Sequence, residues 1–273
     1  MADHIDGPLY FEQLGRRGRP IAFVHPNPLD HSCWVYQMDH LSTWYRCLGI
    51  DLPGYGKSPT ARPGLTVADM AQACWEAVDE VTDEPTIVVG LSVGWHVVMH
   101  MANQRPQQTS AIIMSGCAYR PGPKTYTQGN IAAFTEKKMA AREPHIFGDW
   151  SAAFRETDLA SYFAATLVER NDTADSESIA EIFRALEPRD PDWLFPGAKA
   201  PTLIITGSED NGHTGAFALQ EHIAGSELIT MEGAGHACNM ERPWEWDTHA
   251  LRFLKKQGLF DGEIAQVAAP AVR

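Results

Sequence analysis

The sequence has few of the features that bind a chain to nucleic acid or to a membrane. Its 22 lysines and arginines face 35 acids, so the formal net charge is −13. A chain of that sign, with no long basic run, repels polyanions and anionic lipid surfaces, and we expect neither as a partner. No apolar stretch approaches the ~20 residues that cross a bilayer, and the first residues lack the basic and apolar parts of a secretion signal. We therefore expect a cytoplasmic protein.

Cysteine is also scarce and follows no binding pattern. The five cysteines are odd in number, scattered and never arranged as C-x-x-C: Cys33, Cys47, Cys74, Cys117 and Cys238. This distribution favours reduced thiols in the core over a disulfide framework or a zinc site.

What the sequence does contain is an alternation of short apolar runs with helical patterns. Runs typical of strands cover residues 8–14, 20–25, 47–51, 86–89, 110–115, 201–206 and 227–231. Helical patterns cover residues 67–81, after an N-cap signal at Thr66 with Asp69, and residues 95–102. A chain of 273 residues that is 44% hydrophobic can bury one substantial core. The alternation predicts an α/β protein with a mostly parallel, twisted sheet flanked by helices.

One connection is far longer than a crossover requires. About 85 residues separate Ser115 from the strand that begins at Pro201, where a dozen or so would suffice. This insert is rich in helix formers and large apolar residues: Phe134, Met139, Phe147, Trp150, Phe154, Tyr162, Phe163, Phe183, Trp193 and Phe195. They form either the core of an attached helical layer or the inner face of a lid over an apolar pocket, and both interpretations stay open.

The most informative motif is the five-residue turn Gly90-Leu91-Ser92-Val93-Gly94, between a predicted strand and a predicted helix. A serine at so sharp a turn exposes its hydroxyl, and the flanking glycines let the two backbones approach. The helix N-terminus faces any negative charge that forms beside the serine. A nucleophile that attacks a carbonyl needs this arrangement. Because G-x-S-x-G arises by chance in roughly one chain in ten of this length, the motif alone could be a packing turn.

Two candidate partners of Ser92 follow later strands. Asp210 lies at the end of the strand at 201–206, and His236 lies on a glycine-rich loop after the strand at 227–231. In acyl-transfer chemistry His236 would take the Ser92 proton, and Asp210 would fix the imidazole tautomer. The Val93 amide would be one oxyanion donor, and the loop after His25 should supply the other. Glu209 is an alternative to Asp210 that the spacing after the strand disfavours.

Taken together, these motifs resemble the α/β-hydrolase fold family over nearly the whole chain. The resemblance rests on five pieces in order: the strand ending in His25, the turn Asp51-Leu-Pro-Gly-Tyr-Gly-Lys-Ser58, the elbow Gly90 to Gly94, Gly207-x-x-Asp210, and Gly235-His236 followed by Glu241-Arg242-Pro243. It implies a hydrolase core of residues 1–119 and 199–273, with a helical cap at residues 120–198. It also implies the amide of Asn27 as the second oxyanion donor.

Three positions depart from the family pattern. Pro26 stands where glycine is usual and has no N–H to donate, so the donor would be Asn27, whose bond to Pro28 is a candidate cis peptide. Trp95 stands where a small residue often follows the elbow, so the first helical turn packs differently or narrows the pocket. His213 follows the acid closely and either lines the site or lies at the surface. With His25, Trp95 and His213 are the candidate substrate-binding residues.

The sequence thus predicts a serine hydrolase with no cofactor and no metal. It would cleave a small or medium carboxylic ester, lactone or thioester through an acyl-enzyme on Ser92, and its substrate would be a small, largely apolar molecule. Three alternatives use the same residues and stay open: hydrolysis of carbon–carbon bonds in vinylogous diketones from aromatic degradation, acyl transfer to an acceptor other than water, and a ligand receptor or accessory protein with little turnover. The sequence also leaves open a homo-oligomer.

Single residues argue against three more specific classes of enzyme or binding site. Haloalkane dehalogenases and epoxide hydrolases of this fold use an aspartate where this chain has Ser92. A phosphate-binding loop ending in Gly56-Lys57-Ser58 would need glycine at Asp51. Histidines and acids near position 30 could be interpreted as metal ligands, but a first-loop histidine that packs against the sheet accounts for His25 more simply.

Overall fold

Seven strands form a single sheet in the order β1-β3-β2-β4-β5-β6-β7. The structure is a computed structural model that describes residues 4–117, 119, 125–138, 142–170, 174–187 and 193–264. The strands are β1 (Phe11–Leu14), β2 (Pro20–Val24), β3 (Arg46–Ile50), β4 (Thr86–Leu91), β5 (Thr109–Ser115), β6 (Thr202–Gly207) and β7 (Glu227–Met231). Only the β1–β3 pairing is antiparallel, so the predicted fold class is confirmed.

Most predicted element boundaries lie within two residues of the observed ones. Strand β7 matches the prediction, whereas β1 begins three residues later than the predicted run at 8–14. Helix α2 (Val67–Asp79) begins where the sequence signal places it, because Thr66 and Asp69 form a reciprocal capping box. Strand β4 continues to Leu91, two residues beyond the predicted end, and so delivers Ser92 directly at its carboxyl end.

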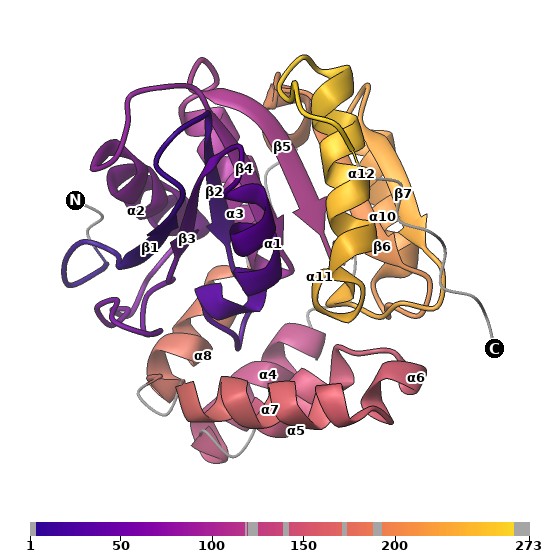
Figure 1. Ribbon diagram of the computed structural model, residues 1–273. Helices are drawn as coiled ribbons and strands as arrows, with labels where there is room; N and C mark the ends of the chain where they lie inside the picture. Colours follow the sequence, from indigo (N-terminus) through magenta and orange to yellow (C-terminus); the bar gives the residue numbers. More distant parts are fainter. Residues whose placement is uncertain are drawn as a thin grey trace.

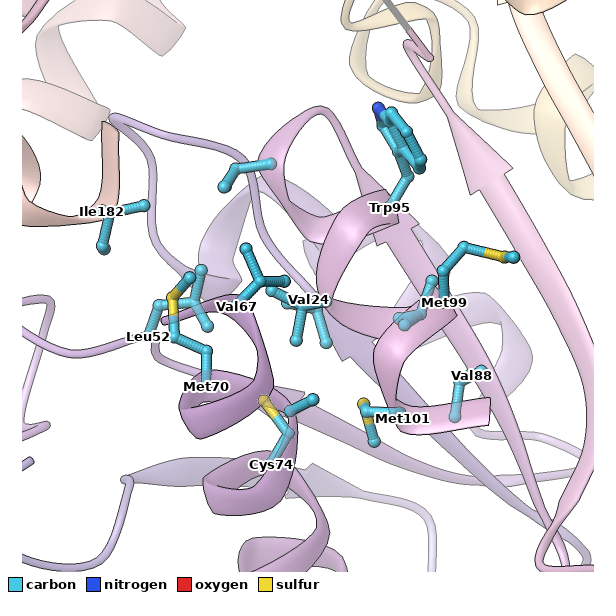
Figure 2. Packing of buried hydrophobic residues seen from close by; sticks show 14 of the residues in the cluster. Val24, Leu52, Val67, Met70, Cys74, Val88, Trp95, Met99, Met101 and Ile182 are labelled. Atoms are coloured by element: carbon cyan, nitrogen blue, oxygen red, sulfur yellow. The ribbon is translucent and has the colours of Figure 1, made fainter. Parts of the chain in front are cut away.

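Helices cover both faces of the sheet (Figure 1). The elements that pack on it are η1 (His31–Trp34), α1 (Val35–Leu41), α2, α3 (Val93–Gln104), α10 (His213–His222), α11 (Cys238–Glu241) and α12 (Pro243–Lys256). Alternate residues of β2 belong to different cores: Val24 packs with α2 and α3, and Phe23 packs with α1 and α12. Figure 2 shows the first core, where Met101 of α3 lies near Val88 of the sheet and Trp95 projects from the first turn of α3.

The long connection between β5 and β6 is helical. It contains α4 (Thr125–Glu136), α5 (Arg142–Gly148), α6 (Ala152–Arg155), α7 (Asp158–Arg170), α8 (Ser176–Ala185) and α9 (Leu194–Gly197), which we call the helical insert. Helices α4 to α8 gather at the edge of the sheet where the parallel strands end (Figure 1). Reacting groups collect at that edge in parallel α/β sheets.

The large apolar residues of the helical insert pack into the same two clusters as the residues of the sheet. Five of its predicted large apolar residues are buried: Phe134, Trp150, Phe163, Phe183 and Phe195. The rings of Phe134 and Phe183 stack with centroids 5.9 Å apart. Tyr162 and Trp193 are instead 65% and 60% exposed, and Met139 lies outside the described residues. Both interpretations of the insert, an attached helical layer and a lid, stay predictions.

The cysteines follow the sequence expectation. All five are buried and free, and burial raises the pKa of Cys74 and of Cys238 to about 12. Within the described ranges, no helix is both long and apolar enough to cross a bilayer. The same part of the chain holds no group of three or more histidines, cysteines or acids arranged to bind a metal ion.

A charged cluster between β1, β3 and η1 gives a testable dependence of stability on pH. His31 Nδ1 lies 2.7 Å from Asp51 Oδ1, and its Nε2 lies 2.9 Å from Glu12 Oε2. Burial disfavours the charged imidazole, but the hydrogen bond and charge of Asp51, helped by Glu12, raise the pKa of His31 to about 9. A histidine in the unfolded chain has a pKa of about 6.5. The contribution of the charged His31 to the free energy of unfolding is therefore complete below pH 6.5 and is lost as the pH rises through about 9.

We expect His31→Gln to lower the free energy of unfolding by about 2 to 3 kcal/mol at pH 6 and by far less at pH 10. Urea unfolding of both proteins at pH 6, 8 and 10 measures this difference. A deficit that stays constant across the range would show that His31 contributes packing rather than charge.

Candidate active site

The elbow between β4 and α3 holds a half-buried serine in a strained backbone conformation. Ser92 has φ 52° and ψ −117°, a backbone region that side chains other than glycine rarely adopt. Its N–H donates a 3.0 Å hydrogen bond to the Ser115 carbonyl at the end of β5, which anchors the turn. Such strain costs on the order of 1–3 kcal/mol and persists only where the surrounding structure imposes it.

The two glycines of the elbow are required by close backbone approach. A Cβ on Gly90 would lie 2.3 Å from the Gly94 carbonyl oxygen, and a Cβ on Gly94 would lie 2.4 Å from the Val24 carbonyl oxygen. Both obstacles are backbone atoms, which cannot turn aside as a side chain can. The glycines therefore let the start of α3 lie directly against β2 and β4.

We expect Gly94→Ala to destabilise the protein by more than about 2 kcal/mol, since the overlap is far closer than van der Waals contact. Gly129→Ala in α4 is the matched control, because nothing lies within 4 Å of its Cβ position. That change should raise the free energy of unfolding by about 0.5–1 kcal/mol, as expected for alanine over glycine inside a helix. Thermal unfolding of both variants checks the pair, and equal effects would contradict the close approach at the elbow.

Asp210 and His236 are brought together by the ends of β6 and β7. Asp210 Oδ1 lies 2.9 Å from His236 Nδ1 and also accepts a 2.6 Å hydrogen bond from the Gly212 N–H. The Asp210 side chain is 1% exposed and that of His236 14% exposed. A carboxylate in this place accepts the Nδ1 proton, so the opposite nitrogen, Nε2, carries the lone pair.

The imidazole of His236 lies at the carboxyl ends of β4 and β5. A Cβ on Gly116, directly after β5, would lie 2.9 Å from Leu91 Cδ1 and 3.0 Å from His236 Cε1. Leu91 is the residue before Ser92, so the serine and the histidine belong to the same end of the sheet. Glu209 is engaged elsewhere, since its Oε2 accepts a 3.1 Å hydrogen bond from the Ala152 N–H.

The two predicted oxyanion donors lie at the start of α3 and on the loop after β2. Val93 opens α3, and the Asn27 amide follows β2 by three residues. Within the described part of the chain, neither N–H donates a hydrogen bond to another protein group. The Asn27–Pro28 peptide is cis, as the sequence suggested. The Asn27 side chain is fixed by the Tyr55 hydroxyl, which donates to Oδ1, and by a 3.2 Å hydrogen bond from Nδ2 to the Ile179 carbonyl of α8.

The predicted substrate-binding residues differ in how far they can reach a ligand. His25 is fully buried; its Nδ1 lies 2.8 Å from the Pro26 carbonyl, and its Nε2 accepts from the Leu52 N–H at 2.8 Å. Both ring nitrogens of His25 therefore have protein partners, and the side chain presents no exposed surface. Trp95 is buried in the core, with its ring stacked on His96 at 3.6 Å. His213 is half-buried at the start of α10 and packs edge-on against Phe217.

The structure adds two residues of the helical insert that the sequence did not single out. His145 packs beside the stacked rings of Phe134 and Phe183, with centroids 6.2 Å and 6.1 Å away. Burial raises the pKa of Asp149, with a contribution from the charge of Asp210, while His236 and His145 oppose it. Burial lowers the pKa of His145. No local sequence pattern identifies these residues, because their proximity to His236 depends on how the helical insert packs against the sheet.

Comparisons with known proteins concern the family and the fold. A sequence model of the alpha/beta hydrolase family matches residues 21–246. The AB hydrolase superfamily protein YisY of Bacillus subtilis (strain 168) is 29% identical over 249 residues, which cover 85% of this chain and 90% of YisY. A pimeloyl-(acyl-carrier protein) methyl ester esterase of Neisseria meningitidis is 25% identical over 73% of this chain and 79% of that esterase. The enol-lactonase of Burkholderia xenovorans LB400 superposes with a TM-score of 0.84 at 22% identity, over 92% of this chain and 98% of the lactonase, and at this identity the likeness concerns the fold alone.

Proposed function

This chain belongs to the alpha/beta hydrolase family, and on that basis we propose that it is a serine hydrolase of small or medium carboxylic esters, lactones or thioesters. The reaction would proceed through an acyl-enzyme on Ser92. The observation that carries the proposal is the 2.9 Å contact between Asp210 and His236, at the end of the sheet where the strained Ser92 turn lies. A nucleophile needs a base, and a base needs a group that orients it.

In the first half of the reaction, Ser92 Oγ attacks the acyl carbon while Nε2 of His236 takes the hydroxyl proton. The bond between Oγ and carbon forms, and the carbonyl oxygen becomes an oxyanion. The N–H groups of Asn27 and Val93 would donate to that oxygen, and the N-terminus of α3 adds a favourable dipole. The intermediate collapses when the carbon–oxygen or carbon–sulfur bond to the leaving group breaks, and His236 returns the proton to the departing alcohol or thiol.

In the second half, water replaces the leaving group. His236 Nε2 takes a proton from the water, whose oxygen attacks the acyl carbon, and the same two amides bind the second oxyanion. Breaking the bond to Ser92 releases the carboxylic acid and returns the proton to Oγ. Asp210 stays ionised throughout and stabilises the imidazolium that forms in each half.

The choice of substrate would depend on the helical insert. The esterase activity in the name of a similar protein supports carboxylic esters as the substrate class. The number of large apolar residues in the helical insert supports an apolar acyl group. The charges of His145 and Asp149 interact with that of His236, so we expect one polar substituent near the scissile bond to be tolerated.

The test is covalent labelling followed by turnover. The folded protein is treated with a fluorophosphonate, the modified peptide is mapped by mass spectrometry, and p-nitrophenyl esters of increasing acyl length are then assayed. We expect modification at Ser92 and a burst of p-nitrophenol. Absence of label on Ser92 in well-folded protein would overturn the mechanism. Labelling without turnover of any ester would replace the ester class with carbon–carbon substrates or with a receptor role.

A further inference from the structure

The reaction described above gives no role to Glu241, the last residue of α11. Its carboxylate lies between two segments that are far apart in the sequence: the turn at residues 149–152 of the helical insert and the loop that carries His236. Oε1 accepts hydrogen bonds from the N–H groups of Ser151 and Gly235, both at 2.9 Å. Oε2 accepts a 2.6 Å hydrogen bond from the Ser151 hydroxyl. One side chain therefore joins the helical insert to the histidine loop.

The two neighbours of His236 in the chain are both held by this arrangement. Gly235, on one side, donates its N–H to Glu241. Ala237, on the other side, donates its N–H to the Asp149 carbonyl of the helical insert at 3.0 Å. The backbone of His236 is thus fixed from both directions by contacts that depend on the turn at 149–152. A shift of that turn would be transmitted to the imidazole.

The contact is tight and largely withdrawn from water. A Cβ on Gly235 would lie 2.5 Å from the Ser151 nitrogen and 2.7 Å from the Trp150 carbonyl carbon. Ser151 is 2% exposed and also caps α6, since its Oγ accepts the Phe154 N–H at 3.3 Å. Burial raises the pKa of Glu241, although its hydrogen bonds from Ser151 and Gly235 work in the opposite direction. Removing this acceptor would leave two backbone N–H groups without a partner.

We propose that Glu241 is a positioning residue. Through Gly235 it holds His236 at the distance and orientation that the reaction with Ser92 needs, and through Ser151 it links that position to the helical insert. The inference rests on the proposed function, because positioning matters only if His236 acts as the base. A misplacement of a reacting group by 1 Å can cost about 100-fold in rate. Glutamine can retain the three contacts, since its amide oxygen accepts both N–H groups and its NH₂ can donate to the Ser151 oxygen. Alanine retains none of them.

The experiment compares Glu241→Ala, Glu241→Gln and the control Glu245→Ala. Glu245 is a partly exposed acid nearby that pairs only loosely, 3.5 Å from Arg242 and 4.0 Å from His249. For each protein we would measure kcat and KM for a p-nitrophenyl ester, the rate of phosphonylation at Ser92 and the melting temperature. We expect Glu241→Ala to lower kcat and the phosphonylation rate about 10- to 100-fold. KM for a short acyl ester should change little, and the glutamine and control variants should stay within about threefold of the wild type.

Amide hydrogen exchange provides a readout that needs no activity. Glu241→Ala should lose protection at Ser151 and Gly235, and Glu241→Gln should keep it. An alanine variant with wild-type kcat per titrated active site would overturn the proposal, and so would a glutamine variant as slow as alanine despite intact protection. A wild-type protein that is neither labelled nor active would overturn the proposed function and positioning with it. Amide hydrogen exchange would then show only whether Glu241 joins the helical insert to the loop that carries His236.

Discussion

Ser92→Ala is expected to lower kcat at least 10⁴-fold while the fold stays intact. The change removes only Oγ, and the structural contact of this residue is the backbone hydrogen bond from its N–H to the Ser115 carbonyl, which alanine keeps. The substitution removes no buried side-chain hydrogen bond in the described part of the chain, so the free energy of unfolding should change by less than about 1 kcal/mol. Steady-state ester hydrolysis and urea unfolding measure the two quantities on the same preparation.

His236→Ala should cause a loss of similar size, because serine and histidine act as one unit. The double variant Ser92→Ala/His236→Ala should then be no slower than either single variant. His249→Gln is the matched control: this half-buried histidine of α12 lies 4.0 Å from Glu245 and has no part in the proposed reaction. Losses that multiply in the double variant would mean that Ser92 and His236 act in separate steps.

Local signals explain why much of the fold could be predicted from the sequence. A β-branched run bounded by turn residues specified β4, and the Thr66–Asp69 capping box specified the start of α2. The elbow glycines were predictable because a G-x-S-x-G turn between a strand and a helix requires the close backbone approach now seen at Gly90 and Gly94. In each case the cause lies within a few residues of the effect.

Contacts between distant segments could not be predicted in the same way. Trp95 was expected either to pack differently or to narrow the pocket, and only the packing of α3 on the sheet places it in the core. His145, Asp149 and the bond between Glu241 and Ser151 depend on how the helical insert returns to the sheet. The insert has no repeated spacing that specifies this return, since its apolar residues pack against one another as well as against the sheet cores.

The choice between the adjacent acids Glu209 and Asp210 depends both on local spacing and on contacts between distant segments. Replacing each acid in turn is the sharpest test of the site. Spacing after the strand favoured Asp210 over Glu209. The structure adds that Asp210 Oδ1 contacts His236 Nδ1, whereas Glu209 accepts a hydrogen bond from the Ala152 N–H. We expect Asp210→Ala to lower kcat about 10³- to 10⁴-fold, since His236 loses the group that fixes its tautomer and stabilises its charge. Glu209→Gln keeps an acceptor for Ala152 and should change kcat less than threefold.

Asp210→Asn should be less damaging than Asp210→Ala, for a reason particular to this site. The His236 Nδ1 and the Gly212 N–H both contact the same oxygen, Oδ1. An asparagine that keeps its carbonyl oxygen there can accept from both, so it preserves the tautomer with the proton on Nδ1 and loses only the negative charge. We expect a decrease in kcat of about 100-fold, corresponding to roughly 2.7 kcal/mol of lost imidazolium stabilisation. The Nδ1 proton resonance should persist in the variant. If that resonance disappears and the rate falls as far as in Asp210→Ala, the asparagine has turned its NH₂ toward the ring and the shared oxygen does not fix the tautomer.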